Sequence, residues 1–491
     1  MKRKNHFCLC LAFLLLMNFG LTACANNGSS SDQETSGSTA ETAAAATETE
    51  IETETDVRDL LPEAVKYDGH TFNFVTVSHS WQQYDQMVFD ELTGDGVVDA
   101  IFNRNITISD LLDISITEQL DYEDSIITKI GNSVASGDKS YDTAMCSVAD
   151  ASVMYNSNYI TVLEDVIDFD APWWYQQFND YVNINGHDNE KFIAYGQGFV
   201  VSYVGGSMVI AANTDMIPRY NLEDPYTVYQ EGRWTMDHMY ENSQAVAADL
   251  NGNGTVTDYT VDQIGSVGAN NQFSLLLAAA GEPLAVREGD TYVLKVSERF
   301  YDVYNKVIQL VTNDAACWRG VSGRDSEYYW TIFNEGRSLY MSNAIAAFKS
   351  ARDGEIPYVL LPYPKADESQ NDYYNVISNF VCGMVIPNGQ NEEELARTAM
   401  ILEYLSAYSE PIYDAFVEST LYHKYARDAE SIVVFRSMLD NIPYNDLGFL
   451  FDWGGIRTNI DSAVAAKTPL ASRLKMLEKL FNKAASNSMK S

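Results

Sequence analysis

The chain is poor in cysteine and histidine. Its six cysteines and six histidines are spread over 491 residues without the paired spacing of a zinc site. Three cysteines lie within the first 24 residues, which leaves Cys146, Cys317 and Cys382 for the rest of the chain. Three cysteines allow one disulfide at most, so a disulfide framework is excluded, and a buried free thiol is the alternative for each.

Basic residues are also scarce. Lysine and arginine number 32 against 69 aspartates and glutamates, which gives a formal net charge of −37. Nucleic-acid affinity comes mostly from cations that neutralise phosphates, so this balance argues against a nucleic-acid partner. An anionic ligand is also disfavoured unless a local basic pocket overrides the overall sign.

The apolar run near the start of the chain is too short to cross a bilayer. It covers residues 7–16, follows the basic residues 2–4 and is ended by Asn18 and Gly20. A transmembrane helix needs about 20 apolar residues, whereas a secretion signal needs only a basic start, a shorter apolar stretch and small residues before the cleavage site. The pattern predicts a signal peptide over residues 1–23.

The end of this signal, Leu21-Thr22-Ala23-Cys24, resembles the lipobox of bacterial lipoproteins. The resemblance implies cleavage before Cys24 and alkylation of its thiol by a diacylglyceryl group. Two or more acyl chains anchor a protein stably, so we expect a lipid-anchored protein on the extracytoplasmic face of a bacterial cell membrane. A plain signal peptide with an incidental cysteine is the alternative.

A low-complexity stretch of Ala, Ser, Thr, Gly and Glu follows Cys24. Residues 25–56 contain eight acidic residues and no basic one. Such a segment buries too little apolar surface to fold. We expect residues 24–59 to be a lipid-anchored linker, extended by its own charge repulsion, that holds a folded body off the membrane.

The rest of the chain has the size and pattern of an α/β protein. Roughly 430 residues are too many for one ordinary core and favour two lobes. Hydrophobic periods of two and 3.6 residues alternate, and the first elements form a β-α-β-α-β unit, which predicts a parallel sheet covered by helices. The predicted elements are a strand over 70–77, a helix over 97–112, a strand over 114–118, a helix over 122–135 that ends at Gly137, and a strand over 142–148.

Ligands of such sheets bind beyond the carboxyl ends of the strands. This rule selects Trp81, in the polar loop after the first strand, and Cys146 and Ser147 at the end of the third.

Several short motifs are spread along the body. They are Arg104-Asn105, Ser136-Gly137-Asp138-Lys139-Ser140-Tyr141-Asp142, Asn213-Thr214-Asp215, Gly232-Arg233-Trp234-Thr235-Met236-Asp237, Phe333-Asn334-Glu335-Gly336-Arg337 with Met341, and Leu361-Pro362-Tyr363-Pro364. None is diagnostic alone, but in order and spacing they resemble family 1 of the extracellular solute-binding proteins, the receptors of ABC importers.

The resemblance implies a periplasmic-binding-protein-like fold, in which two hinge-linked α/β lobes enclose the ligand in a central cleft. Lobe 1 would hold residues 66–208 and 372–410, and lobe 2 would hold residues 209–371 and 411–491. Such receptors deliver their ligand to the membrane subunits of an ABC permease. We expect this one to act as a monomer.

Carbohydrate, and specifically an oligosaccharide, is the expected ligand. The chain has 31 Tyr, 21 Phe and 7 Trp, and flat rings stack on sugars, which are the usual ligands of the family, although aromatic residues mostly build cores. Trp81 is the first stacking candidate. Trp453 is the second, because Gly454 and Gly455 permit close backbone approach and Asp452 can accept sugar hydroxyls. Packing is the alternative for both tryptophans.

Alignment with a maltose-binding member of the family adds three positions. Cys146 and Ser147 fall where that relative places a stacking aromatic residue, and Asn343 falls near another. This chain has no aromatic residue there, so a maltose-like binding mode is not expected, and the three residues stay ligand-binding candidates. Four other tryptophans are expected to pack: Trp173, Trp174, Trp234 and Trp330. Thr235 is expected to cap the helix that follows it.

One segment matches the first half of an EF-hand calcium loop. Side-chain oxygens stand at positions one, three and five, Gly254 stands at six, and a main-chain carbonyl follows at seven. The glutamate of position twelve is missing, and Asp258 or Asp262 would close a shortened loop. The candidate ligands of a structural Ca²⁺ are Asp249, Asn251, Asn253, Thr255 and Asp258. A metal-free turn is the alternative.

Two rival classes of function stay open. A surface carbohydrate-active enzyme would use a pair of carboxylates, which sequence alone cannot locate among 69 acidic residues. No Gly-x-Ser-x-Gly, phosphate-loop or His-Glu-x-x-His motif occurs, so we expect no catalytic residue and no catalytic cofactor. A ligand sensor that presents its closed form to a membrane receptor would use the same fold and cleft.

Overall fold

The computed structural model describes most residues between 56 and 489. The chain divides into two units, Met1–Glu54 and Thr55–Ser491, and the described residues belong to the second. The predicted signal peptide, Cys24 and Trp81 lie outside the described residues. The described residues are 56–78, 84, 86–122, 125–183, 190–196, 204–256, 258, 260–268, 273–289, 291–312, 317–319, 326–348, 351, 354–378, 381–418, 428–440 and 451–489.

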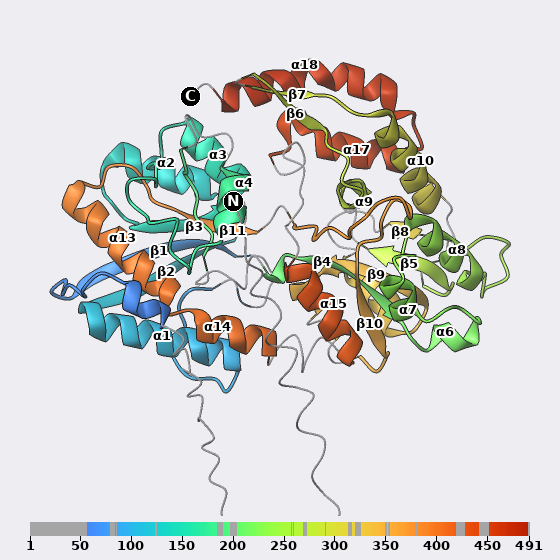
Figure 1. The fold of residues 1–491 in the computed structure, drawn as a ribbon, viewed down its shortest axis with the longest axis horizontal. Coiled ribbons are helices and arrows are strands. Elements are labelled where there is room, and N and C mark those ends of the chain that lie inside the picture. Colours follow the sequence, from blue (N-terminus) through green and yellow to red (C-terminus); the bar gives the residue numbers. More distant parts are fainter. Residues whose placement is uncertain are drawn as a thin grey trace, which may run out of the picture. The chain divides into compact units, whose positions relative to one another are not determined.

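The first sheet contains the predicted β-α-β-α-β unit (Figure 1). Its strands are His70–Ser78 (β1), Ile114–Tyr122 (β2), Thr143–Ser147 (β3) and Cys382–Val385 (β11). The helices between the first three strands are Gly96–Leu112 (α1) and Ile126–Ser136 (α2). The strand order is β11-β3-β1-β2, with β1 parallel to β2 and β3, as predicted. The structure adds β11, which pairs antiparallel with β3.

The structure corrects one predicted boundary in this sheet. β2 runs to Tyr122 because all nine of its residues pair with β1, from His70↔Ile114 to Ser78↔Tyr122. The following helix therefore begins at Ile126 rather than at residue 122. It ends as predicted, because Gly137 has φ 71° and donates its N–H to the Ser133 carbonyl.

The second sheet is also mixed. Its strands are Met208–Asn213 (β4), Ile264–Gly268 (β5), Cys317–Arg319 (β8), Ser338–Ala344 (β9) and Tyr358–Pro362 (β10). In the order β10-β4-β9-β5-β8, the pairs β10–β4 and β4–β9 are antiparallel, and β9–β5 and β5–β8 are parallel. Every residue of β4, β5 and β9 is buried, as expected of strands covered on both faces.

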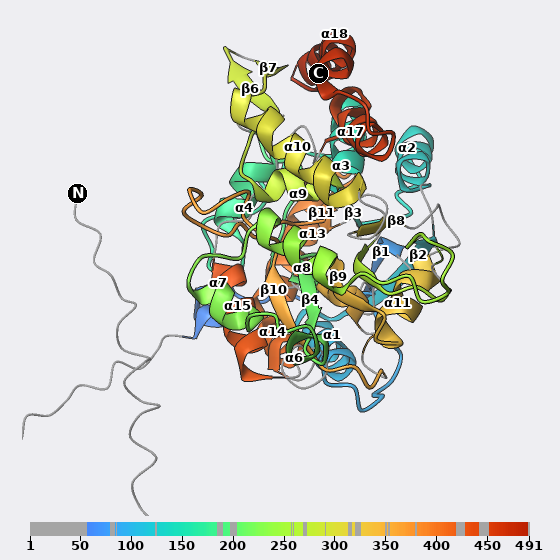
Figure 2. The same cartoon turned by 90° about the vertical axis from the view of Figure 1, so that its right-hand side faces the viewer.

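The remaining elements surround the two sheets or extend from them (Figures 1 and 2). Ala285–Glu288 (β6) and Thr291–Leu294 (β7) form an antiparallel hairpin. The other α-helices are Val148–Asn156 (α3), Gln176–Val182 (α4), Met216–Arg219 (α6), Pro225–Gln230 (α7), Met236–Val246 (α8), Phe273–Ala279 (α9), Glu298–Thr312 (α10), Ser326–Asn334 (α11), Glu392–Ala407 (α13), Glu410–Asp414 (α14), Ala429–Asp440 (α15), Ile456–Ala465 (α17) and Leu470–Ser488 (α18). The 3₁₀-helices among the described residues are Val57–Leu60 (η2), Ile345–Phe348 (η5) and Trp453–Gly455 (η7). None of the described helices has both the length and the apolar character to cross a bilayer.

Helix starts follow local capping chemistry. The Thr235 hydroxyl accepts the His238 N–H at 3.2 Å, which confirms it as the N-cap of α8. α13 begins with a capping box, in which the Asn391 side chain accepts the Glu394 N–H at 3.0 Å and the Glu394 carboxylate accepts the Asn391 N–H at 2.8 Å.

Three of the tryptophans expected to pack hold buried contacts. Trp173 and Trp174 are each 3% exposed, and both donate their indole N–H to the buried Glu403 carboxylate. Trp234 is fully buried and donates its Nε1–H to the Pro362 carbonyl at 2.8 Å. These contacts confirm the packing prediction and tie chain segments that are far apart in sequence.

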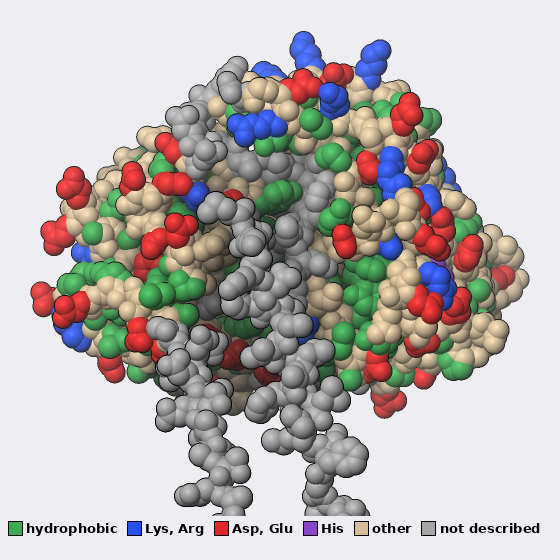
Figure 3. Space-filling view, in the orientation of Figure 1, with side chains coloured by type: hydrophobic (Ala, Val, Ile, Leu, Met, Phe, Trp, Pro, Cys, Tyr) green, Lys and Arg blue, Asp and Glu red, His purple; other side chains and the backbone are tan. Residues whose placement is uncertain are grey.

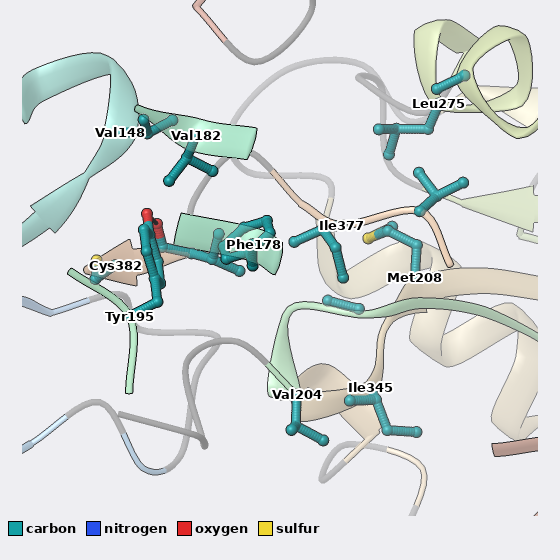
Figure 4. Packing of buried hydrophobic residues seen from close by; sticks show 14 of the residues in the cluster. Val148, Phe178, Val182, Tyr195, Val204, Met208, Leu275, Ile345, Ile377 and Cys382 are labelled. Carbon is teal, nitrogen blue, oxygen red and sulfur yellow. Dashed lines mark hydrogen bonds between the residues drawn. The ribbon is translucent and has the colours of Figure 1, made fainter. Parts of the chain in front are cut away.

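Two chain segments pair where the chain passes between the sheets. Met208 donates its N–H to the Val376 carbonyl at 2.8 Å, and Ser378 donates its own to the Gly206 carbonyl at 2.9 Å. Figure 4 shows Ile377 between Met208 and Phe178, and all three belong to one continuous hydrophobic core. We call residues 204–208 and 375–378 the crossing segments. The predicted lobe boundaries stay predictions.

Candidate functional site

The carboxyl end of β3, a predicted ligand position, lies against β11. Cys146 pairs with Gly383 and Ser147 with Cys382. Cys146 is fully buried, and burial raises the pKa of its thiol well above the ordinary value. Cys146 and Cys382 are both free thiols. A buried protonated thiol behaves as a small apolar group rather than as a nucleophile or metal ligand.

Ser147 is engaged in capping α3. Its Oγ accepts the Asp150 N–H at 3.2 Å and donates to Asp150 Oδ2 at 2.7 Å. The hydroxyl thus caps the N-terminus of α3 in this structure. Contact of Cys146 or Ser147 with a ligand stays a prediction.

Asn343 lies near the end of β9 in the second sheet. Its Nδ2 donates to the Tyr329 hydroxyl at 3.3 Å, and its Oδ1 accepts the Ala344 N–H at 2.8 Å. Trp330, beside Tyr329 on α11, packs edge-on against Phe348 with ring centres 5.3 Å apart, as its packing prediction requires. The sequence did not mark Tyr329, whose only signal is its place beside a tryptophan. A ligand-binding role for Asn343 stays a prediction.

Trp453 is packed into the core of the C-terminal region. Only 4% of it is exposed. Its ring stacks on Phe451 with centres 5.3 Å apart and meets Phe481 edge-on at 5.6 Å, while Nε1 donates to Ser488 Oγ at 3.1 Å. In this arrangement Trp453 packs in the core, which is the alternative given for it above. Stacking of its ring on a sugar stays a prediction, and it would require the ring to become exposed.

Asp452 holds the turn that leads into α17. It has φ 47°, and its Oδ1 accepts the Arg457 N–H at 2.8 Å. The predicted ligand residues thus lie at three places: the end of β3, the end of β9 and the turn before α17. No hydrogen bond or ring contact joins these places within the described part of the chain.

The crossing segments contain polar groups that the sequence did not reveal. Asn375 is fully buried, and neither its Oδ1 nor its Nδ2 has a hydrogen-bond partner in the described structure. The Oγ of buried Ser207, which forms a β-bridge with Ile377, also has none. A buried amide without partners costs free energy.

The predicted calcium loop is closed by hydrogen bonds in this structure. The Asp249 carboxylate accepts N–H groups from Gly252 at 2.7 Å and Gly254 at 2.6 Å, and these bonds lower its pKa. Asn251 Nδ2 donates to Asp258 Oδ2 at 3.1 Å. The Asp258 carboxylate is therefore brought next to the Asn251 side chain, although the two residues are seven positions apart. The donor set consists of oxygens, as Ca²⁺ prefers.

The buried base of this loop is Asp262. It is fully buried, and its carboxylate accepts the N–H groups of Leu250 at 3.0 Å and Asp258 at 2.9 Å. Asp262 thus joins the two ends of the loop, which explains how the segment stays folded on itself.

A pocket of about 720 Å³ opens elsewhere, between the start of the unit and α13. Its walls include Pro62, Trp173, Met400 and Glu403. None of the predicted ligand residues that the structure describes is among its walls. Its volume suits a small molecule. The crossing segments differ from it in holding fully buried polar groups without partners, and we take them as the candidate site.

Comparison with known proteins gives the fold. No protein-family model matches the chain, and no curated protein sequence matches it either. Solved structures do match, and we describe three of them.

An ABC substrate-binding protein of Listeria monocytogenes in complex with cycloalternan is 12% identical; the match covers 85% of this chain and 100% of that one, with a TM-score of 0.57. A cyclic alpha-maltosyl-1,6-maltose binding protein of Arthrobacter globiformis is 13% identical, over 85% and 100% of the two chains, with a TM-score of 0.56. The maltose/maltodextrin-binding domain of Bdellovibrio bacteriovorus bound to maltotriose is 12% identical, over 85% and 97%, with a TM-score of 0.51. The chain therefore has the two-lobe α/β fold of carbohydrate-binding receptors of ABC importers, as the sequence motifs predicted.

Proposed function

We propose that this protein is an extracytoplasmic receptor that captures an oligosaccharide and delivers it to an ABC permease without changing it. The observation that carries the proposal is the fold match over about 85% of the chain to receptors solved with cycloalternan and maltotriose. The lipid anchor on Cys24, the permease and a monomeric state are parts of the same proposal. They rest on the signal sequence and on the resemblance to solute-binding proteins.

We place the ligand at the crossing segments. Asn375 and Ser207 would bond sugar hydroxyls there, because both are buried with unpartnered polar atoms. Trp81, which follows β1 in the sequence, is proposed to stack on a sugar ring. Asn343 would contribute from the second sheet beside Tyr329.

The decisive experiment is a thermal-shift screen of the Thr55–Ser491 unit against mono- and oligosaccharides, amino acids, peptides and polyamines, with product analysis of each hit. A sugar that raises the melting temperature and is recovered intact supports the receptor. Cleavage of the sugar would favour the surface enzyme instead. Stabilisation by a non-sugar alone would overturn the ligand class. Reconstituted uptake with the permease separates import from sensing.

We also propose that the Asp249 loop binds a structural Ca²⁺. Asp249, Asn251 and Asn253 would supply side-chain oxygens, Thr255 its main-chain carbonyl, and Asp258 the closing carboxylate. The oxygen-only donor set and the contact of the Asp258 carboxylate with Asn251 support the proposal. The ion would stiffen the loop and take no part in binding the sugar.

A further inference from the structure

The last helix reverses the charge balance of the chain. α18 contains Arg473, Lys475, Lys479 and Lys483 but only one acidic residue, Glu478, whereas the chain as a whole has 32 basic and 69 acidic residues. It lies at the outer edge of the unit in Figures 1 and 2, and basic side chains stand out from that edge in Figure 3. A basic edge on an acidic protein indicates a partner of opposite charge.

One side of α18 holds the helix on the body. Leu474, Leu477 and Phe481 are buried, and Asn482 Oδ1 accepts the Leu294 N–H of the β6–β7 hairpin at 2.8 Å. Since the buried residues follow a helical spacing of three and four, the opposite side faces solvent. The outer face, as we call it, consists of Lys475, Met476, Lys479, Leu480 and Lys483.

The outer face combines charge with exposed apolar surface. Met476 is 68% exposed and Leu480 is 56% exposed. They stand four residues apart, so they are neighbours on the helix, beside the row formed by Lys475, Lys479 and Lys483. Two large apolar side chains displayed among lysines are the arrangement of a helix that lies on a membrane surface.

The lysines of the outer face have no ion-pair partner within the described structure. Several lysines elsewhere on the body do have one: Lys129 pairs with Asp121 at 2.8 Å, Lys139 with Glu394, and Lys295 with Glu288 at 3.1 Å. In a chain with so many carboxylates, three unpaired lysines in two helical turns leave their charge available to an external partner.

We propose that the outer face of α18 docks on an anionic lipid surface. The lysines would contact lipid headgroups, while Met476 and Leu480 would enter the boundary between headgroups and acyl chains. The long lysine stems allow the ammonium groups to stay at headgroup level while their methylenes pack beside the apolar side chains. The linker would then act as a tether that lets the body reach the bilayer rather than as a fixed spacer. The contact would determine which side of the receptor faces the membrane.

A membrane fits this face better than a small anion or an acidic protein does. A small ligand is held by groups that converge in a concavity, whereas the outer face is the convex side of a helix. Recognition of individual carboxylates or phosphates favours the planar fork of arginine, whereas the three unpaired cations are lysines. A flat anionic surface can be bound by lysines on a convex helix face, because it requires neither a concave site nor the planar geometry of arginine.

The test is co-sedimentation of the Thr55–Ser491 unit, which lacks the proposed anchor, with phosphatidylcholine vesicles prepared with and without phosphatidylglycerol. We expect binding only to the vesicles with phosphatidylglycerol. It should decline as salt rises from about 0.1 M to about 1 M, because the Debye length falls from roughly 10 Å to 3 Å. Lys475→Gln/Lys479→Gln/Lys483→Gln should weaken binding about a hundredfold, given the contribution of each lysine near an anionic bilayer.

The matched control removes the same charge elsewhere, as Lys66→Gln/Lys139→Gln/Lys295→Gln, and should bind as the parent does. Met476→Gln/Leu480→Gln should retain the salt dependence but bind at least tenfold more weakly, since apolar burial would be lost. Equal binding by both lysine triple variants, or no binding to phosphatidylglycerol, would overturn the proposal. Retention by soluble polyglutamate without vesicle binding would replace the lipid by an acidic polypeptide.

Discussion

Glu403 is a buried carboxylate on α13 that accepts three hydrogen bonds from residues 168–174. It is 8% exposed and accepts the indole N–H groups of Trp173 and Trp174 and, at 2.9 Å, the Asp168 N–H. Burial raises its pKa, against the opposing effect of these hydrogen bonds. One side chain therefore holds three donors from a segment more than 200 residues away.

We expect Glu403→Ala to destabilise the protein strongly. The change leaves buried indole donors without an acceptor, at roughly 1–3 kcal/mol for each. Glu403→Gln should cost less, because the amide oxygen still accepts. Urea unfolding at neutral pH measures both, and equal stability of the alanine variant and the parent would contradict this role.

Glu403 also predicts a pH dependence. Because its folded-state pKa lies above the ordinary value of 4.5, the folded protein binds the proton more tightly than the unfolded chain does. This contribution to stability is complete below the ordinary pKa and is lost as pH rises through the folded-state value. The stability of the parent relative to Glu403→Gln should therefore fall as pH is raised across that window. A constant difference in unfolding free energy would count against a raised pKa.

Asn375 should show opposite effects on stability and on binding. Asn375→Leu removes unpartnered polar atoms from a buried site, so the free energy of unfolding should rise by about 1–3 kcal/mol, while affinity for the sugar should fall at least tenfold. The matched control is Asn179→Leu. Asn179 is as deeply buried, but its amide accepts the Tyr195 N–H at 2.7 Å and donates to the Tyr195 carbonyl at 2.9 Å, so the control should destabilise. Destabilisation by both variants would remove Asn375 from the site.

Whether the role of a single residue can be predicted from the sequence depends on the kind of residue. Trp173, Trp174 and Trp234 were predicted to pack, and their buried contacts confirm it, because a large apolar ring is most stable inside a core. Asn375 and Tyr329 could not be predicted. An asparagine in a loop is ordinary, and only the three-dimensional neighbourhood reveals that its amide lacks partners.

At the scale of elements, the Asp249 loop provides a metal-dependent test. Asp249→Ala should lower the melting temperature when calcium is present and have little effect in a chelator, because the first ligand of the ion would be lost. Asp224→Ala is the control: it removes the N-cap carboxylate of α7, which accepts the Thr227 N–H at 2.7 Å, and its effect should not depend on calcium. Equal loss with Asp249→Ala in calcium and in chelator would reject the ion.

Elements were predicted best where their signals are local. β1, α1, β3 and the end of α2 follow from hydrophobic period and from the glycine after the helix. The extension of β2 to Tyr122 was missed because its pairing with β1 supports residues whose own sequence, Gln119-Leu120-Asp121-Tyr122, does not mark a strand. Tertiary pairing, rather than intrinsic propensity, sets that boundary.

At the scale of the whole molecule, ligand binding should close the receptor. A sugar that bridges two lobes shifts the open–closed equilibrium toward the closed state. Small-angle scattering of the Thr55–Ser491 unit should then give a smaller radius of gyration with the ligand found in the thermal screen. An unchanged radius at saturation would contradict closure while leaving binding itself intact.

Anchoring is the second property of the whole molecule to test. Cys24→Ser removes the thiol that the lipobox resemblance assigns to lipid attachment. Expressed in a bacterial host, the variant should move from the membrane fraction to the soluble fraction, whereas the parent should remain with the membrane and carry a mass increase on its first residue. A parent that fractionates as the variant does would favour the plain signal peptide.

The fold class could be predicted from ordered motifs, but the order of strands in the second sheet could not. β4 pairs with β9 and β10, more than 100 residues further along the chain. Short motifs such as Gly232-Arg233-Trp234 mark local structure, and Trp234 reaches Pro362 only in the folded protein. Pairing over such distances leaves no periodic trace in a single sequence.

The edge of the first sheet has a consequence for how the protein is made. β3 is complete at Ser147, but its partner strand β11 begins at Cys382, and the Thr143 hydroxyl donates to the Val385 carbonyl at 3.0 Å. A chain emerging from its amino end therefore carries an unpaired strand edge until most of its length has been produced. An exposed strand edge is a template for pairing with another chain. The nascent protein is therefore prone to aggregation during much of its synthesis, until the residues of β11 have been synthesised and can pair with β3.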